Sequence, residues 1–225
     1  MHSDAVLRLI VDVAAQVVVP RFRALADHEV IEKSPGDLVT IADREGEERI
    51  TEALLADDPN ALVVGEEAVA HNPSLLDELG HASHAWLVDP VDGTRNFVKG
   101  SPDYAVMVAE IRDGVTVRGW IWQPAHELAM TGERLGGVFV NGMPVTRPAP
   151  APGESPPWAG RSARRVLQGG HGQVSVSHTA YCCGVDYPNL VLGVTDFLLY
   201  VHSRPWDHAA GALFVEEVGG VVQRR

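Results

Sequence analysis

The sequence predicts an α+β fold in which a mixed sheet is covered by helices. Three observations support this class. The first segment carries apolar residues at helical spacing, residues 104–131 read as successive strands, and a helical pattern returns after Asp207. Helices at both ends with strands between them are typical of layered α+β structures, in which each layer buries its apolar face against the next.

The composition describes a chain that can bury a real core. It has 225 residues, 45% of them hydrophobic, and a mean hydropathy close to zero. Its formal charge of −12 argues against sequence-independent binding of nucleic acid, which needs Lys and Arg on phosphates. The only cysteines, Cys182 and Cys183, are adjacent, so a disulfide between them would be strained. We expect a reducing compartment.

The N-terminal segment predicts an amphipathic helix and not a signal peptide. Arg8 and Asp12 interrupt its apolar run. No uncharged stretch of the sequence is long enough to cross a bilayer. We therefore expect a cytoplasmic protein with no membrane partner. The apolar residues at helical spacing are Val6, Leu9, Ile10, Val13, Val17 and Val18.

The first third of the chain then predicts a helix between short strands. A turn-rich stretch at 33–37 opens into an apolar strand at 38–40. A charged helix follows over roughly 41–57, and an apolar strand over 61–64 comes next. After a polar segment, a further buried strand is expected at 84–89.

Strands dominate the middle of the chain. They are expected at 104–111, 115–122 and 127–131, with Asp113-Gly114 as a strong hairpin turn. Residues 147–160 contain five prolines and read as a surface loop or as a connection between two lobes.

The C-terminal segment predicts a strand followed by a helix. Residues 195–202 alternate as a strand, which Pro205-Trp206 ends. A helix then begins at Asp207 and stops at Gly219-Gly220. Residues 221–223 would begin another strand.

Residues 86–97, WLVDPVDGTRNF, place Asp89 and Asp92 directly after a buried strand. Pro90 can neither continue a central strand nor donate a hydrogen bond, so we expect the chain to turn at once. The glycine after Asp92 permits a tight turn, and Thr94 can cap the helix that follows. One short loop therefore offers two carboxylates, a hydroxyl, free carbonyls and unpaired N–H groups.

Acidic residues stand at element boundaries in four places. They are Asp43 near a helix start, Glu66 after a strand, Asp89 with Asp92 after the next strand, and Asp207 at a helix start. Strand ends and helix N-termini on one edge of a layered α/β structure can converge. Ligands that are all oxygen, in a chain without Cys/His metal spacing, suit a hard cation such as Mg²⁺ or Mn²⁺.

Each feature also has an ordinary structural explanation. An Asp-Pro-x-Asp-Gly segment is most often a surface turn, and Asp207 alone is more often a helix N-cap than a ligand. Glu66 and Glu67 together read as a solvated pair. Asp43 can simply interact favourably with the positive N-terminal end of its helix dipole. His208 is as readily an exposed side chain as a functional one. Only the joint order of these residues along the chain points to a common site.

That joint order resembles the inositol monophosphatase family, which includes histidinol-phosphate, fructose-bisphosphate and nucleotide phosphatases. The likeness spans most of the chain, and its Asp-Pro-x-Asp-Gly-Thr-x-Asn-Phe element is highly specific. It implies a layered αβαβα sandwich, a phosphoric monoester hydrolase activity and inhibition by Li⁺, and we expect a homodimer. The matching segments are KSPGDLVTIAD (33–43), VGEEA (64–68), WLVDPVDGTRNF (86–97), GWIWQP (119–124) and PWDHAAGALFVEEVGG (205–220).

Position by position, the resemblance implies a centre of two or three Mg²⁺ ions, with Mn²⁺ as an alternative. Asp89 would bridge two of the ions, with Glu66 on the first. Asp92 and Asp207 would bind the second, and the backbone carbonyl of Val91 completes the ligand set. Such a centre would lower the pKa of the attacking water and stabilise the leaving alkoxide.

The same resemblance assigns the residues that activate water and bind substrate. Thr94 and Asp43 would orient the attacking water and help to deprotonate it, and Glu66 is counted with them as catalytic. The N–H groups of Gly93 and Thr94 would hold the phosphate at a helix start. The predicted substrate contacts are Asp92, Gly93, Thr94, Tyr200 and Asp207. Metal ligands thus fall mostly in a lobe over 1–146, whereas Asp207 and the substrate-facing segment belong to a lobe over 147–225.

One departure from the family bears on the substrate. Tyr200 stands where inositol monophosphatases carry a glutamate that hydrogen-bonds an inositol hydroxyl, and a neutral phenol is a weaker acceptor than a carboxylate. Inositol phosphate, histidinol phosphate, a sugar phosphate and a 3′-phosphonucleotide therefore stay open as the small phosphorylated metabolite.

Two other classes of function also stay open. One is a catalytically silent homologue used for binding, although such proteins typically lose a metal ligand or the water-activating pair. The other is a structural Ca²⁺ site, which would not require Thr94 or Asp43. Because this chain keeps all of these residues, we favour Mg²⁺-dependent hydrolysis of a phosphomonoester.

Overall fold

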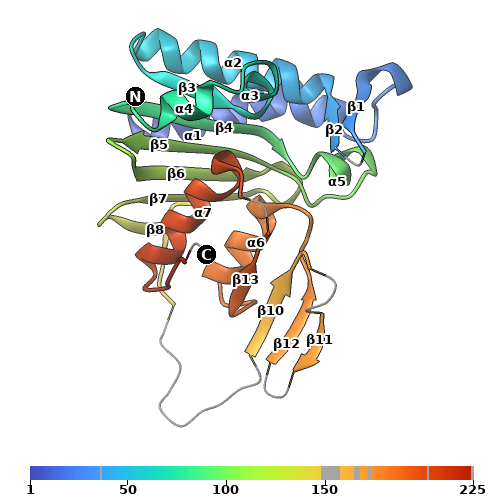
Figure 1. The fold of residues 1–225 in the computed structure, drawn as a ribbon, viewed down its shortest axis with the longest axis vertical. Coiled ribbons are helices and arrows are strands. Elements are labelled where there is room, and N and C mark those ends of the chain that lie inside the picture. The colour runs from blue at the N-terminus through green and yellow to red at the C-terminus, as the bar shows by residue number, and fades with distance from the viewer. Residues whose placement is uncertain (36, 148–157, 165–167, 172–173, 202, 224–225) are drawn as a thin grey trace.

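The chain folds into alternating layers of helices and sheets (Figure 1). The N-terminal helices cover one face of a seven-stranded sheet, two C-terminal helices cover its other face, and a four-stranded sheet lies beyond them. The predicted α+β class is confirmed, and the described residues form the first four layers of the predicted αβαβα order. The computed structural model describes residues 1–35, 37–147, 158–164, 168–171, 174–201 and 203–223.

The seven-stranded sheet keeps its strands in chain order; α3 and α4 connect β3 to β4, and shorter connections join the later strands. Only β3 and β4 run parallel; each later strand is antiparallel to its neighbour. The predicted hairpin at Asp113-Gly114 is present, with φ values of 48° and 76°. The strands are β3 (Leu62–Gly65), β4 (His84–Asp92), β5 (Ala105–Arg112), β6 (Val115–Gln123), β7 (Leu128–Glu133), β8 (Gly137–Val140) and β9 (Met143–Val145).

The second sheet is smaller and contains parallel pairs. Its order is β11-β12-β10-β13, with β10 parallel to both neighbours. Its strands are β10 (Trp158–Ser162), β11 (Gly169–His171), β12 (Val174–His178) and β13 (Phe197–Leu199). A separate hairpin joins β1 (Val30–Ser34) to β2 (Asp37–Thr40). The predicted division of the chain into lobes at residue 147 stays a prediction, and residues 148–157 lie outside the described part of the chain.

The helices are short apart from those that cover the large sheet. No helix in the described part of the chain is long and apolar enough to span a membrane. The helices are α1 (Ser3–Val13), α2 (Ile41–Asp57), α3 (Glu66–His71), α4 (Leu75–Leu79), α5 (Thr94–Val98), α6 (Cys183–Val191) and α7 (Pro205–Glu217), and α1 continues as a π-helical turn over Ala14–Val18.

Strand β4 is the central element of the core. Trp86 and Val88 pack with Ile10 among the N-terminal helices, whereas Leu87 packs with Phe214 on the opposite face. Every residue of β4 is buried. Because both faces of the sheet are covered, the strand is a continuous apolar run that ends at its acidic residues.

The prediction that the chain turns at Pro90 is wrong. β4 extends to Asp92, and the pairing with β5 shifts register between Asp89 and Asp92. Such an irregularity leaves a residue without a ladder partner, so a proline that cannot donate a hydrogen bond is tolerated there.

Other boundaries also differ from the expectation. The strand expected at 195–202 is limited to β13, and α7 begins at Pro205, because proline is well suited to the first turn of a helix. Residues 221–223 form no strand. Residues 158–160, which were expected to be loop, belong to β10, whose partners β12 and β13 lie later in the sequence.

Candidate active site

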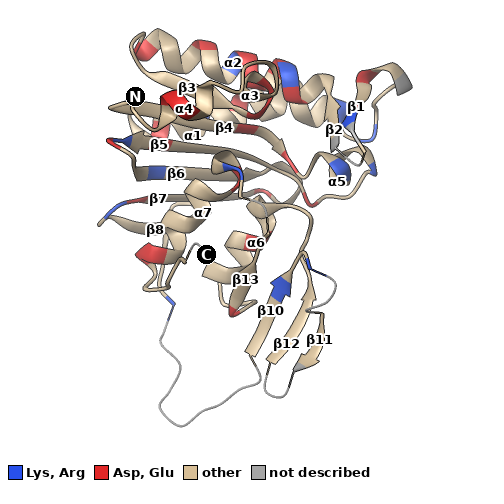
Figure 2. Ribbon diagram, viewed as in Figure 1, with Lys and Arg blue, Asp and Glu red and all other residues tan. Residues whose placement is uncertain are grey.

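A cavity of about 750 Å³ opens beside the C-terminal end of β4. In Figure 2, acidic positions on β4 are seen where this strand approaches α5. The cavity brings together every predicted metal ligand and both predicted phosphate-binding residues, although they come from three separate segments. Its lining includes Lys33, Glu66, Asp89, Val91, Asp92, Gly93, Thr94, Arg95, Tyr181, Arg204, Trp206 and Asp207.

The segment between β4 and α5 is fixed by its own side chains. The Val91 N–H donates to Asp89 Oδ1 at 3.1 Å, and the Thr94 hydroxyl lies 3.0 Å from the Val91 carbonyl oxygen. Gly93 has φ +82°, and a Cβ there would lie 2.9 Å from the Asp103 carbonyl oxygen. A side chain at this position would therefore be strained in conformation and would clash.

Asp43 lies behind Thr94 and contacts it directly. The Thr94 hydroxyl is 3.0 Å from Asp43 Oδ1, while Asp43 Oδ2 accepts hydrogen bonds from the Thr40 N–H and hydroxyl. These bonds exist because Thr40 and Asp43 form the capping box of α2. Burial raises the pKa of Asp43 to about 7, despite the hydrogen bonds that oppose the shift.

The three remaining aspartates form a crowded acidic group. Burial raises the pKa of Asp89 well above its usual value, and the nearby carboxylates of Glu66, Asp92 and Asp207 add to the shift. Burial likewise raises the pKa of Asp92 to about 6 and that of Asp207 to about 8. The N–H of Gly184 and the thiol of Cys182 both donate to Asp92 Oδ2. Carboxylates that raise one another's pKa in this way favour either protonation or a bound cation.

Lys33 joins the two glutamates at the start of α3. Its Nζ lies 3.0 Å from Glu66 Oε1 and 2.8 Å from Glu67 Oε1. Burial lowers the pKa of Lys33, but the hydrogen bond to Glu67 and the charge of Glu66 outweigh it, so the pKa is raised. The interpretation of Glu66 and Glu67 as a solvated pair is wrong for Glu67, which is buried because α2 packs over it.

Glu47 is a functional candidate that the sequence reasoning missed. It accepts hydrogen bonds from the N–H groups of Glu67 and Ala68, at 2.8 and 2.7 Å, and so anchors the first turn of α3. A Cβ at Gly65 would lie 2.2 Å from Glu47 Cδ, which explains the glycine. The signal was available in the sequence, since Glu47 follows Asp43 by one helical turn and shares the buried face of α2.

Two arginines in the cavity wall were also missed. Arg95 and Arg204 stand beside motif residues, and the guanidinium of Arg95 lies 5.2 Å from the centre of the Tyr181 ring. They place positive charge next to the acidic group, where an anionic substrate would enter.

The Tyr200 side chain is hydrogen-bonded to Asp186, a residue outside the lining of the larger cavity. It is not among the described residues that line the cavity, and its hydroxyl donates to Asp186 Oδ2 at 2.8 Å. Asp186 is fully buried and also bonds Arg161 and the Ala180 N–H. A role for Tyr200 in substrate binding stays a prediction.

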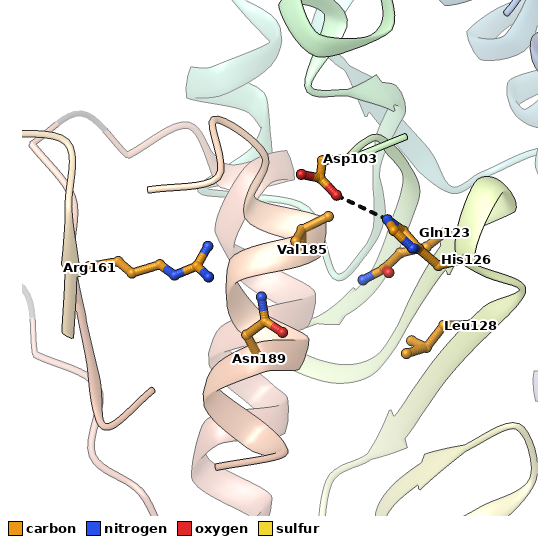
Figure 3. A pocket seen from close by; sticks show the side chains of 7 residues that line it. All are labelled: Asp103, Gln123, His126, Leu128, Arg161, Val185 and Asn189. Carbon is orange, nitrogen blue, oxygen red and sulfur yellow. Dashed lines mark hydrogen bonds and ion pairs between the residues drawn. The ribbon is translucent and has the colours of Figure 1, made fainter. Parts of the chain in front are cut away.

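A second cavity of about 330 Å³ lies behind this region, between β6, β7 and α6 (Figure 3). His126 Nε2 lies 3.0 Å from Asp103 Oδ1 in its wall, and the side-chain N–H of Gln123 donates to the Gly184 carbonyl at 2.7 Å. It contains none of the predicted catalytic or metal-binding residues. We therefore assign the candidate active site to the larger cavity.

Comparison with known sequences gives the family. Residues 3–225 match the family model described as the inositol monophosphatase family. The chain is 30% identical over 234 residues to the inositol-1-monophosphatase of Rhizobium meliloti, covering 98% of this chain and 85% of that protein. It is 28% identical over 219 residues to the fructose-1,6-bisphosphatase/inositol-1-monophosphatase of Aquifex aeolicus, covering 92% of this chain and 79% of that protein. It is also 28% identical over 231 residues to the Nus factor SuhB of Pseudomonas aeruginosa, covering 89% and 78%.

Solved structures show the same fold. The extragenic suppressor protein SuhB of Bartonella henselae superposes with a TM-score of 0.77 at 27% identity, over 96% of this chain and 85% of that one. An IMPase from Thermotoga maritima also superposes with a TM-score of 0.77, at 21% identity, over 96% of this chain and 82% of that one. The chain therefore belongs to the inositol monophosphatase family, whose members are phosphoric monoester hydrolases that generally use divalent metal ions.

Proposed function

We propose that this protein hydrolyses a small phosphomonoester and that it needs Mg²⁺ or Mn²⁺ to do so. One observation carries the proposal: the buried carboxylates of Asp89 and Asp92 share a cavity with the Thr94 hydroxyl, which is already hydrogen-bonded to a third buried acid, Asp43. Acidic groups that only stabilised the fold would not need this hydroxyl–carboxylate pair beside them.

The donor set fits a divalent cation. Its atoms are all oxygen, which Mg²⁺ and Mn²⁺ prefer, and burial and mutual repulsion raise the pKa of Asp89, Asp92 and Asp207. The residues that would hold the cations are Glu66, Asp89, Asp92, Asp207 and the carbonyl of Val91. Bound there, divalent cations would supply Lewis-acid stabilisation of the phosphoryl group and a water of lowered pKa.

Thr94 and Asp43 supply the water-orienting function. Because the Thr94 hydroxyl directs its proton to Asp43 or to the Val91 carbonyl, its lone pairs are left to accept a hydrogen bond from water. With a pKa raised to about 7 by burial, Asp43 can take up a proton near neutral pH, as a general base must.

Phosphate binding would use backbone and cationic groups together. The N–H groups of Gly93 and Thr94 stand at the start of α5, and Arg95 and Arg204 line the same cavity. The arginines would attract a dianionic substrate to a chain whose net charge is −12.

We keep the expectation of a cytoplasmic homodimer as part of the proposal.

The substrate is not chiefly inositol monophosphate, because Tyr200 replaces the acidic acceptor and is engaged by Asp186. The test is phosphate release from inositol 1-phosphate, histidinol phosphate, a sugar phosphate and a 3′-phosphonucleotide, with Mg²⁺ and with EDTA. We expect turnover that stops in EDTA, inhibition by Li⁺, and a preference for inositol phosphate below about a hundredfold in kcat/KM, or ~2.7 kcal/mol.

Full activity in EDTA would refute the metal requirement. A preference for inositol phosphate above about a hundredfold would refute the interpretation of Tyr200. Absence of turnover on all of these esters would favour a catalytically silent binding protein instead.

A further inference from the structure

Cys183, Asp207 and His208 form a compact group at the junction of α6 and α7. One ligand atom from each side chain lies within 4.8 Å of the other two. Among the described residues, no other set of three His, Cys, Asp or Glu side chains meets this criterion. The sequence did not predict it, because Cys183 is distant along the chain from the Asp207-His208 pair and the spacing matches no zinc motif.

From this group we infer a site for a borderline transition-metal ion such as Zn²⁺, distinct in its donor atoms from the all-oxygen site. A thiolate, an imidazole and a carboxylate are the three donor types that zinc takes, whereas Mg²⁺ and Ca²⁺ take oxygen. Tetrahedral zinc with bonds of ~2.0–2.3 Å holds its ligand atoms roughly 3.3–3.8 Å apart. Movements of the side chains by about 1 Å would bring the three ligand atoms to this spacing.

His208 is held by aromatic neighbours in the manner of a metal ligand. The Tyr187 hydroxyl lies 3.0 Å from His208 Nδ1, and the Tyr200 ring stands edge-on to the imidazole at 4.9 Å. A hydrogen bond on one ring nitrogen fixes the tautomer and orients the other nitrogen. In the tautomer whose Nδ1–H donates to the Tyr187 hydroxyl, Nε2 is the nitrogen that would bind the metal. Tyr187 is fixed in turn, because it packs against Gly211, where a Cβ would lie 2.1 Å from its ring.

The site has an entrance from the larger cavity. Asp207 lines that cavity, while Cys183 is buried, so a metal would arrive from the side of Asp207. The three side chains leave a fourth tetrahedral position for water. When the metal binds, the Cys183 S–H bond breaks, an S–metal bond forms, and the proton passes to the buffer.

The site shares Asp207 with the proposed Mg²⁺ centre. A zinc ion that holds Asp207 competes for a ligand of that centre, so we expect Zn²⁺ to inhibit hydrolysis and excess Mg²⁺ to relieve the inhibition. This consequence rests on the proposed function, whereas binding itself does not.

Cobalt titration of the metal-free full-length protein tests the site without turnover. Co²⁺ bound to a thiolate gives a sulfur-to-metal charge-transfer band in the near ultraviolet, and Co²⁺ on carboxylates does not. We expect a band that saturates at one ion per chain, is lost in Cys183→Ser, and persists in the matched control Cys182→Ser. Zn²⁺ should displace Co²⁺ and remove the band.

His208→Gln keeps the sulfur and tests the imidazole. It should retain its Mg²⁺-dependent rate, yet bind Zn²⁺ about tenfold more weakly or worse, and need correspondingly more Zn²⁺ for half-inhibition. The inference is overturned if the native protein gives no charge-transfer band, if the band survives in Cys183→Ser, or if His208→Gln binds Zn²⁺ as tightly as the native chain. Failure of phosphate release with the band intact would refute only the proposed function.

Discussion

The two walls of the candidate site are held in different ways. The wall formed by β4, α5 and the start of α2 is held largely by contacts within short motifs, such as Val91 to Asp89 and Thr40 to Asp43, and Thr94 to Asp43 then joins two of these motifs. The wall formed by α6, β13 and α7 is held by contacts between separate elements, such as that of Tyr200, directly after β13, with Asp186 of α6. The first wall matches the family motifs closely; in the second wall, α7 with Asp207 also matches them, whereas Tyr200 departs from them.

This difference separates reaction chemistry from ligand preference. Carboxylates and a hydroxyl that must act together have to be fixed to within a fraction of an ångström, which a short self-bonded motif can do. Side chains that select a substrate or a further metal can change one at a time, because each is supported by packing from a different element. If the separation holds, substitutions in the first wall should reduce the rate more than substitutions in the second.

Asp89→Asn should have the largest effect. The substitution keeps the shape of the side chain but removes one charge from the centre of the acidic group, so we expect the rate to fall about a hundredfold or more, ~2.7 kcal/mol. Asp77→Asn, at an exposed position of α4, is the matched control and should retain the native rate. An Asp89→Asn protein that kept more than about a tenth of the rate would show that Asp89 is not the bridging ligand.

Thr94→Val should come next. Valine has the shape of threonine but cannot bond Asp43 or orient water, and groups that act in proton transfer typically contribute about 10²–10⁴-fold. We expect kcat to fall by about a hundredfold and KM to change little. Thr94→Ser restores the hydroxyl and should recover most of the rate; equal losses in both variants would indicate a packing role for the methyl group.

The metal-free protein should lose stability as pH rises. Burial raises the pKa of Asp92 to about 6, of Asp43 and Glu47 to about 7, and of Asp207 to about 8, so the native state holds protons that the unfolded chain has released. Stability from these groups is fully present below about pH 4 and is lost as pH rises through 6 to 8.

Thermal unfolding followed at several pH values checks this expectation. Tm should fall between pH 5 and 8 in EDTA, and added Mg²⁺ should restore it most at the upper end, because ligand binding to the native state is stabilising. A Tm that rises with pH in EDTA would contradict the account of the acidic group.

Tyr200→Phe should have the smallest effect. It removes one hydrogen bond to Asp186, which is not among the proposed Mg²⁺ ligands. Such a bond is worth about 0.5–1.5 kcal/mol, or up to ~3 kcal/mol if the acceptor is charged. We expect kcat/KM to shift by less than about tenfold, with the ratio between inositol phosphate and the other esters changing more than kcat. A loss as large as that of Thr94→Val would show that the two walls are not separable.

Local features were predictable from the sequence to a large extent. The bounds of α2 and the turn at Asp113-Gly114 follow from helix periodicity, caps and turn chemistry. The predicted metal ligands line one cavity because β4, α3 and α7 all end or begin at the same edge; they are Glu66, Asp89, Val91, Asp92 and Asp207. Each of these elements carries its own local signal.

What escaped prediction depends on partners far along the chain. Its spacing from Asp43 places Glu47 on the buried face of α2, but the hydrogen bonds of Glu47 to the start of α3 and the pairing of Glu67 with Lys33 join residues that are far apart along the chain. Pro90 fits within β4 only because the pairing with β5 is irregular. The Cys183 group exists only once α6 and α7 are packed, so no spacing rule could find it.

The most direct test of the central claim is to measure metal occupancy and turnover in one sample. The protein is stripped with EDTA and dialysed, Mn²⁺ is added in steps, and bound Mn²⁺ is counted by electron paramagnetic resonance while phosphate release is followed. We predict no turnover in the stripped protein and a rate that rises in step with occupancy. Turnover without bound metal, or full occupancy without turnover on any of the four esters, would contradict the account.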